Sequence, residues 1–117
     1  MVNDDDIAVS AVIPAYNAER FISETIQSIL DQTHPVCEII VVDDGSADKT
    51  ADVAAKFPKT RVIRRPNGGQ GAARNTGIYA AVGNWIGLLD HDDVWYPQKT
   101  ELQMAHIRPG VGVNHGN

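Results

Sequence analysis

One uninterrupted apolar run, residues 39–42, constrains the fold of this chain more than any other feature of the sequence. Its four residues, Ile-Ile-Val-Val, are all β-branched, which favours a strand. They do not alternate with polar residues, and that pattern is typical of a strand covered on both faces. Such strands occur mainly in parallel sheets flanked by helices. The run therefore predicts a central strand, over residues 38–42, of a helix-covered sheet.

The rest of the chain alternates between strand patterns and helical patterns. Apolar residues recur at helical spacing after Ala18, namely at Phe21, Ile22, Thr25, Ile26, Ile29 and Leu30. We expect the other strands over 8–13, 61–64 and 85–89, and the start of a fifth at 110–113. We expect helices over 18–30, 72–81 and 97–107. Another helix is expected to begin at a cap formed by Ser46 or Asp48 and to run to residue 57. Pro14 and Pro58 are expected to end the elements before them. This alternation implies right-handed crossovers and an α/β fold with a mostly parallel sheet.

Composition narrows the classes of protein to which the chain can belong. Its 117 residues allow one domain, and ten Lys and Arg against fifteen Asp and Glu give a formal net charge of −5. A chain without a basic patch is not expected to bind a nucleic-acid backbone. The single cysteine, Cys37, excludes an internal disulfide, fits a reducing compartment, and is interpreted as a small buried thiol at the start of a strand.

The N-terminal segment is acidic where a secretory signal would be basic and then apolar. No apolar stretch approaches the ~20 residues of a membrane span. We therefore expect a soluble chain in which residues 1–7 are a disordered lead-in and residues 8–117 form one domain.

Polar clusters follow each of the four main strands, at residues 14–19, 43–46, 67–71 and 90–93. Loops that leave the carboxyl ends of parallel strands lie along one edge of the sheet, so we expect these clusters to line a single crevice. An alternative is that turn residues are polar in any case. Two loops with paired acids on the same edge favour a site.

The last cluster, Asp90-His91-Asp92-Asp93, concentrates three carboxylates behind an apolar strand. Carboxylates this close repel one another, and a divalent cation bound to a phosphate ligand would offset the repulsion. His91 is interpreted as a spacer and Asp93 as a cap of the following helix. The cluster predicts a hard cation, Mn²⁺ or Mg²⁺, and nucleotide chemistry.

Four motifs in order carry a resemblance to a known family: VIPAYNAE (12–19), IVVDDGS (40–46), NGG with ARNTG (67–77) and LDHDD (89–93). Together they span about residues 8–100 and resemble the nucleotide-sugar-binding half of the inverting family 2 glycosyltransferases. The resemblance implies the GT-A fold, with a Rossmann-like sheet. It also implies metal-assisted transfer of a sugar from a UDP-linked donor to an acceptor hydroxyl, with inversion at the anomeric carbon. It assigns Asp90 to the ribose, Asp92 to the metal that bridges the two phosphates, and Asp44 to the base.

The ends of the first two strands supply the candidate residues for the base. A base needs an acceptor for its ring N–H, and Asp44 is placed to be that acceptor, which would suit uracil. Asp43 is either a second ligand contact or a cap of the following helix. Pro14 and Ala15 would frame the base from the other side, partly through backbone groups.

Tyr16 and Glu19 complete this predicted wall of the site. Tyr16 would frame the base, and Glu19 would bond to the base or the ribose. Core packing is the alternative for Tyr16, and a helix N-terminal carboxylate is the alternative for Glu19. The resemblance favours ligand contact for both.

The glycine-bearing loop at 67–71 differs from a dinucleotide fingerprint in spacing and in position, because it follows the third strand. Gly69 would permit close approach of the backbone to a ligand. Arg74, one turn into the next helix, is predicted to lie on the ligand side or to pair with an aspartate. A solvated helix cation is the alternative.

The resemblance also implies what else the reaction needs. A general base, normally a carboxylate, must lie near the acceptor, and in the resembled family it comes from a later segment. We expect it beyond Asn117, so the chain looks like a truncated N-terminal half that binds donor and transfers sugar poorly or not at all. Implied acceptors are saccharide, lipid-linked or protein, in cell-wall or polysaccharide synthesis. The implied location is cytoplasmic, with peripheral attachment to the inner face of the membrane.

Two other functions remain open from the sequence. Acidic pairs at strand ends also occur in metal-dependent phosphotransfer domains, which would want a catalytic lysine at another strand end, and none stands at such a position. A nucleotide-binding α/β module without catalysis is the second alternative.

Overall fold

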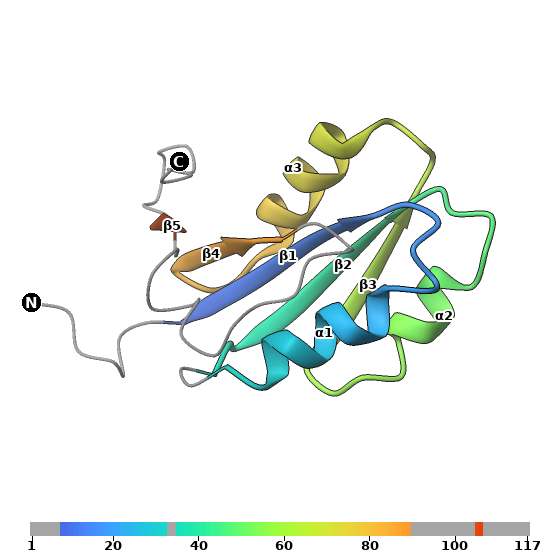
Figure 1. The fold of residues 1–117 in the computed structure, drawn as a ribbon. Coiled ribbons are helices and arrows are strands. Elements are labelled where there is room, and N and C mark those ends of the chain that lie inside the picture. Colours follow the sequence, from blue (N-terminus) through green and yellow to red (C-terminus); the bar gives the residue numbers. More distant parts are fainter. Residues whose placement is uncertain (1–7, 33–34, 90–104, 107–117) are drawn as a thin grey trace, which may run out of the picture.

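The fold, in a computed structural model that describes residues 8–32, 35–89 and 105–106, is an α/β arrangement around one sheet (Figure 1). Its elements follow in the order β1 (Val9–Ala15), α1 (Ile22–Leu30), β2 (Glu38–Asp44), α2 (Thr50–Ala54), β3 (Thr60–Arg65), α3 (Gln70–Ala80), β4 (Trp85–Leu88) and β5 (Ala105–His106). Strands alternate with helices from β1 to β4, as the sequence predicts.

The sheet has the strand order β3-β2-β1-β4-β5. β1 pairs in parallel with β2 and with β4, β2 pairs in parallel with β3, and β5 runs antiparallel to β4. The predicted mostly parallel sheet is confirmed. The chain moves outward from β1 to β3 and then returns to the other side of β1 for β4.

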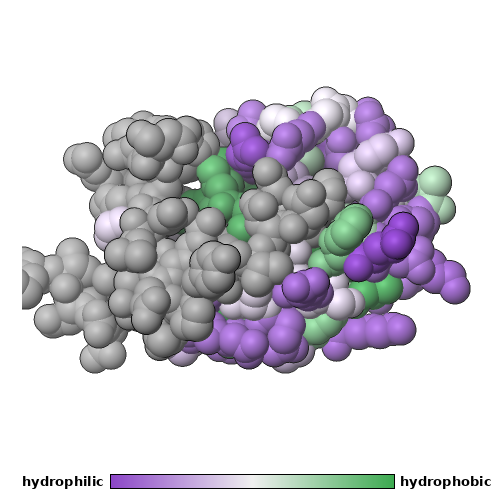
Figure 2. Space-filling model, in the orientation of Figure 1, coloured by the Kyte–Doolittle hydropathy of each residue, from purple (hydrophilic) through white to green (hydrophobic). Residues whose placement is uncertain are grey.

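Helices cover both faces of this sheet. α1 and α2 lie on one face and α3 on the other (Figure 1). The first layer is built on Ile22, Ile26 and Ile29 of α1, which pack with alternate residues of β1 and β2 in one buried cluster. On the other face, Ile40 and Val42 form a second cluster with Ala73 of α3. The 39–42 run is fully buried, which explains its lack of alternation. Most of the described surface in the view of Figure 2 is hydrophilic, with only scattered apolar residues.

Gly77 sets how closely α3 approaches the sheet. A Cβ at this position would lie 2.3 Å from Cγ1 of Val12 and 3.1 Å from Cγ2 of Val42. The helix therefore rests directly on the central strands at a point where no side chain fits.

Pro14 does not end β1, contrary to the sequence prediction. The strand continues to Ala15, and Pro14 lies opposite Val42 of β2. Val12 O accepts from Leu89 N, so the backbone groups of even-numbered β1 residues face β4. The N–H that Pro14 lacks would point to that side, past the end of β4 at Leu88. The proline therefore removes no hydrogen bond between β1 and β2.

Several other predictions differ from the structure. α1 begins at Ile22, and Phe21, just before it, is 47% exposed because it precedes the first buried turn. α2 is shorter than predicted; single turns closed by Val53 O and Ala54 O continue the chain to Phe57. Cys37 is exposed, one residue before β2 begins, and not buried.

The predicted helix over 97–107 is wrong at residues 105–106, which form β5. The antiparallel pairing with Trp85 and Ile86 of β4 replaces helical bonds there. The remainder of that predicted helix, the lead-in over 1–7 and the strand expected at 110–113 lie outside the described residues.

Candidate functional site

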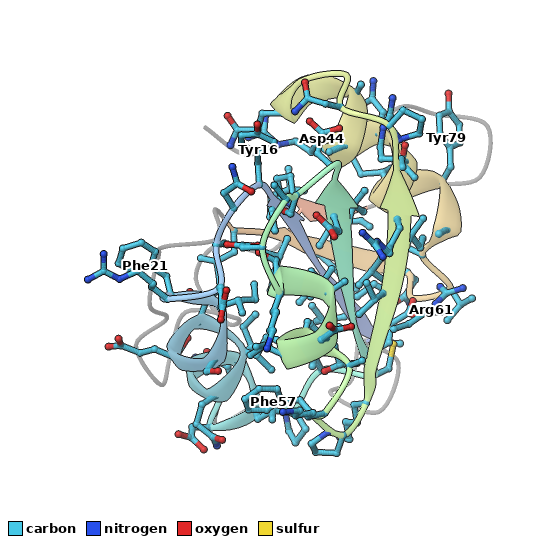
Figure 3. The ribbon with its side chains drawn as sticks, turned by 90° about the vertical axis from the view of Figure 1, so that its right-hand side faces the viewer. Tyr16, Phe21, Asp44, Phe57, Arg61 and Tyr79 are labelled. Atoms are coloured by element: carbon cyan, nitrogen blue, oxygen red, sulfur yellow. The ribbon has the colours of Figure 1, made fainter. Side chains whose placement is uncertain are left out.

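The carboxyl edge of the sheet brings together the loops that the sequence singles out. β2 and β3 extend the sheet on one side of β1, and β4 lies on the other, so the strand order reverses beside β1. In open α/β sheets, ligands bind at such a reversal, outside the carboxyl ends of the strands. Tyr16 and Asp44, which follow β1 and end β2, both lie at this edge in Figure 3. Leu89 leads from β4 into residues 90–93.

Asp43 carries a buried carboxylate that is only half satisfied. The residue is 1% exposed and lies between Ala15 of β1 and Arg64 of β3 in the sheet. Its Oδ1 accepts from the Ser46 N–H at 3.0 Å. Its Oδ2 is buried and accepts no hydrogen bond from the residues that the structure describes. Nε of Arg64, a largely exposed side chain, lies 3.5 Å away as an ion pair without hydrogen-bond geometry. A buried oxygen of this kind is ready to accept a donor.

Asp44 holds the glycine loop to the end of β2. Its Oδ1 accepts from Gly68 N at 3.0 Å and its Oδ2 from Gly69 N at 2.9 Å. Arg65 adds an ion pair, with Nε 3.4 Å from Oδ1, and the residue is 3% exposed. Gly69 has φ of 97°, a left-handed conformation that favours glycine. In this structure Asp44 serves first as an anchor for the loop before α3.

Five hydrogen bonds join residues 17–19 to residues 46–50, and we call this set the loop clamp. Asn17 N donates to Ser46 Oγ at 2.8 Å, and Asn17 Oδ1 accepts from Ala47 N at 2.9 Å. The others are Ala18 N to Thr50 Oγ1, Glu19 N to Asp48 Oδ2 and Lys49 N to Glu19 Oε1. The loops after β1 and β2 are therefore fixed to each other by backbone N–H groups and side-chain oxygens from both loops.

The carboxyl group of Asp48 has a lowered pKa. Burial by itself would raise this pKa, but hydrogen bonds donated by the Thr50 hydroxyl, the Thr50 N–H and the Glu19 N–H together bring it below the ordinary value of 3.8. Because the folded pKa is the lower one, the unfolded chain binds more protons between the two values. The stabilisation is therefore complete above the unfolded pKa and is lost as the pH falls through the folded one.

The lowered pKa of Asp48 predicts how the effect of Asp48→Asn on stability depends on pH. We expect the difference in unfolding free energy between wild type and the variant to stay constant from pH 7 to about pH 5 and to shrink below the ordinary Asp value. Urea unfolding at several pH values between 7 and 2.5 measures this difference. A difference that widens below pH 4 would contradict the assignment of charged Asp48 to the loop clamp.

The structure gathers most of the predicted site residues at one edge. Pro14 and Ala15 end β1, and Tyr16 follows them, 48% exposed. Glu19 lies in the loop clamp, where its carboxylate accepts a backbone N–H. Arg74 lies in the second turn of α3 with its Nε buried. Asp90 and Asp92 lie outside the described residues. Ligand contact by each of these residues stays a prediction.

Sequence reasoning missed the residues that connect the loops. Thr50 accepts from Ala18 and donates to Asp48, and Arg65 pairs with Asp44 while donating to Ala72 O and the Thr76 hydroxyl. The sequence predicts Ser46 or Asp48 only as a helix cap, although both belong to the alternation Ser46-x-Asp48-x-Thr50. Small polar residues in that pattern also satisfy backbone groups of a neighbouring loop, which is the signal that could have found them.

Among residues 8–32, 35–89 and 105–106, no three His, Cys, Asp or Glu side chains lie together as a metal site would require. In the same ranges, no helix combines the length and apolar character that crossing a bilayer demands.

Comparison with known proteins adds a decisive observation. The family model described as "Glycosyl transferase family 2" matches residues 10–117. This chain belongs to glycosyl transferase family 2. One relative, UDP-Glc:alpha-D-GlcNAc-diphosphoundecaprenol beta-1,3-glucosyltransferase WfgD of Escherichia coli, is 38% identical over 97% of the chain.

Solved structures agree with the family 2 assignment. S. aureus TarS 1-349 in complex with UDP-GlcNAc matches with a TM-score of 0.75 and 30% identity over 81% of this chain. The mannosyltransferase PcManGT of Pyrobaculum calidifontis, in complex with GDP-Man and Mn²⁺, matches with a TM-score of 0.71 and 27% identity over 81%. The predicted GT-A fold is confirmed by these matches.

The family 2 chain is shorter than the proteins it resembles. It spans 46% of WfgD, 29% of TarS 1-349 and 30% of PcManGT. It is thus less than half as long as the curated relatives that it matches. The similarity covers the N-terminal part of the family 2 domain.

Proposed function

We propose that this chain is the donor-binding part of an inverting glycosyltransferase that takes its sugar from a UDP-linked donor. The observation that carries the proposal is the Asp43 carboxylate at the carboxyl edge of the sheet, whose buried Oδ2 accepts no hydrogen bond within residues 8–32, 35–89 and 105–106. A pyrimidine ring N–H would satisfy this oxygen. TarS, the structural match in complex with UDP-GlcNAc, supports a uridine nucleotide.

The two aspartates of β2 then have different roles. Asp43 accepts the base N–H through Oδ2 while Oδ1 keeps its bond to Ser46 N. Asp44 keeps the glycine loop in place through Gly68 and Gly69, so that Gly69 can approach the ligand with its backbone. This division departs from the resemblance, which gives Asp44 the base, and it follows from which carboxylate oxygen is already occupied.

The wall opposite the aspartates comes from the end of β1. Pro14 and Ala15 present backbone and small apolar groups, and the exposed ring of Tyr16 packs against the base. Glu19 supports this wall through its bond to Lys49 N, and Arg74 supplies a cation to the diphosphate side. Asp90 holds the ribose.

Asp92 is the proposed ligand of a divalent cation, Mn²⁺ or Mg²⁺. Its segment follows Leu89, which hydrogen-bonds to Val12 O at the end of the β1–β4 ladder, beside the proposed base site. A hard cation suits carboxylate and phosphate oxygens, and when bound it neutralises the charge that develops on the departing nucleoside diphosphate. The Mn²⁺ in the PcManGT structure supports this choice.

The reaction is displacement at the anomeric carbon by an acceptor hydroxyl, with a general base from outside residues 1–117. The acceptor is a saccharide, lipid-linked or protein hydroxyl; WfgD, whose name includes a diphosphoundecaprenol acceptor, supports the lipid-linked class. We place the full protein in the cytoplasm, at the inner face of the membrane where such an acceptor lies.

Calorimetric titration of the chain with UDP in the presence of Mn²⁺ tests the proposal. We expect binding that EDTA abolishes, that GDP does not match, and that Asp92→Ala weakens, because Asp92 would hold a metal that offsets the charge of the diphosphate. Asp52→Ala, which removes an exposed carboxylate from α2, is the control and should leave binding unchanged. Metal-independent binding, or robust sugar transfer by these 117 residues alone, would contradict the proposal.

A further inference from the structure

The loop clamp ends immediately beside Tyr16, the aromatic residue of the proposed base site. Ala18 and Thr50 are both fully buried, so the bond from Ala18 N to Thr50 Oγ1 is closed to water. A backbone N–H that loses a partner in such a place has no solvent substitute, and the segment that carries it must move. The position of the loop after β1 therefore depends on its partners in the loop after β2.

The turn that aims Tyr16 is also held by the loop clamp. Asn17 has φ of 50°, a left-handed conformation that costs a non-glycine residue roughly 1 kcal/mol. Its two hydrogen bonds, to Ser46 Oγ and from Ala47 N, stabilise that conformation. Tyr16 is the residue before this turn; it is 48% exposed and belongs to neither core cluster of the described residues. Its direction is set by the backbone that follows.

Asp48 takes part in three hydrogen bonds at the loop clamp, as many as Thr50. Its Oδ2 accepts from Glu19 N at 3.2 Å, and its Oδ1 accepts from Thr50 N at 3.0 Å and from the Thr50 hydroxyl. Both oxygens thus bind the protein's own donors. One N–H of the segment that precedes α1, that of Glu19, is occupied by this carboxylate. Asp48 therefore acts on a ligand only through other residues.

We propose that Asp48 is a positioning residue for the nucleotide: through the backbone of Ala18 and Glu19, and through Thr50, it holds Tyr16 in the orientation that packs against the base. This inference rests on the proposed function. It gives Asp48 a role different from that of the two aspartates of β2, which contact the base or the glycine loop.

The test is a double-mutant cycle of UDP affinity between Asp48→Asn and Tyr16→Ala. Asparagine keeps the shape of the side chain, but its NH₂ must face one of the donors that the carboxylate now accepts. We expect Tyr16→Ala to weaken UDP binding about tenfold and Asp48→Asn about fivefold. In the Tyr16→Ala background, Asp48→Asn should change the affinity by less than about twofold, because the residue through which it acts is gone.

Two further variants keep this test decisive. Asp52→Asn makes the same change of charge on α2, outside the loop clamp, and should leave UDP affinity unchanged. Ser46→Ala removes the acceptor of Asn17 N and reaches the same turn from another side. It should show the same non-additivity with Tyr16→Ala, and it decides the question if Asp48→Asn does not fold.

The outcomes separate this inference from the proposed function. If wild type does not bind UDP, the proposed function fails and the inference fails with it. If wild type binds and Asp48→Asn binds equally well, only the inference is overturned. Additive losses from Asp48→Asn and Tyr16→Ala would also overturn it, since a residue that merely stabilises the fold weakens binding by the same factor in either background.

Discussion

Asp43→Asn is expected to weaken UDP binding by roughly ten- to a hundredfold, the range that follows from losing one hydrogen bond to a charged acceptor. The buried Oδ2 accepts no hydrogen bond within the described chain, so a base N–H bound there would gain a charged partner out of water. Asparagine retains an oxygen for Ser46 N but offers NH₂ in place of Oδ2. Calorimetric titration of both proteins with UDP and Mn²⁺ gives the two affinities.

A ligand change identifies the bond that this substitution removes. UDP methylated at the ring nitrogen N3 lacks the proposed donor, and wild type should bind it as weakly as Asp43→Asn binds UDP itself. The variant should bind the two ligands with similar affinity, because the bond is already absent. If wild type instead binds the methylated ligand as tightly as UDP, Asp43 does not read the base. Asp44→Asn then becomes the variant to measure.

Gly77→Ala is expected to destabilise the chain by about 2–3 kcal/mol. The new Cβ would lie 2.3 Å from Cγ1 of Val12, a distance that no packed pair of carbons tolerates. Val12 is fully buried in β1 and cannot turn away without disturbing the core, so α3 must shift from the sheet. Urea unfolding followed by far-UV circular dichroism measures the loss.

The matched control lies in the same helix. At Gly71 a Cβ meets nothing within 4 Å, so Gly71→Ala adds only helix propensity and should stabilise the chain by about 0.5–1 kcal/mol. Opposite signs from one substitution at two glycines of α3 would establish that close packing, and not backbone freedom, requires glycine at 77. Equal effects at both positions would refute that explanation.

The sheet could be predicted from the sequence because burial leaves a direct trace in it. The 39–42 run shows no alternation, and the structure buries both of its faces, one against α1 and α2 and the other against α3. The same holds for the order of elements and for the edge where the loops gather. These features depend on period and on chain order, which one sequence contains in full.

Contacts between loops could not be predicted in the same way. The sequence predicts Asp44 as an acceptor for a ligand. In the structure its oxygens accept hydrogen bonds from Gly68 N and Gly69 N, because the backbone N–H groups of this glycine turn lie next to the carboxylate. Glu19 likewise binds Lys49 N. Such partners depend on distances of a few ångströms between segments far apart in sequence. Residue type alone indicates that a carboxylate will be paired, but it does not indicate which group will be its partner.

Exposure at the ends of elements was the other source of error. Phe21 fits the helical spacing of α1 but stands before its first turn and is half exposed. The pattern over 97–107 suggested a helix, whereas residues 105–106 add a strand to the free side of β4. Pairing with an available strand edge can override a local preference of this size.

Pro14 has one more consequence. In a parallel ladder, the donor after the bond from Leu89 N to Val12 O would be the N–H of residue 14, and proline has none. The hydrogen-bond ladder between β1 and β4 therefore lacks its next donor from β1, although β1 itself runs on beside β2. Pro14, proposed as part of one wall of the binding site, therefore also limits the hydrogen bonding between β1 and β4.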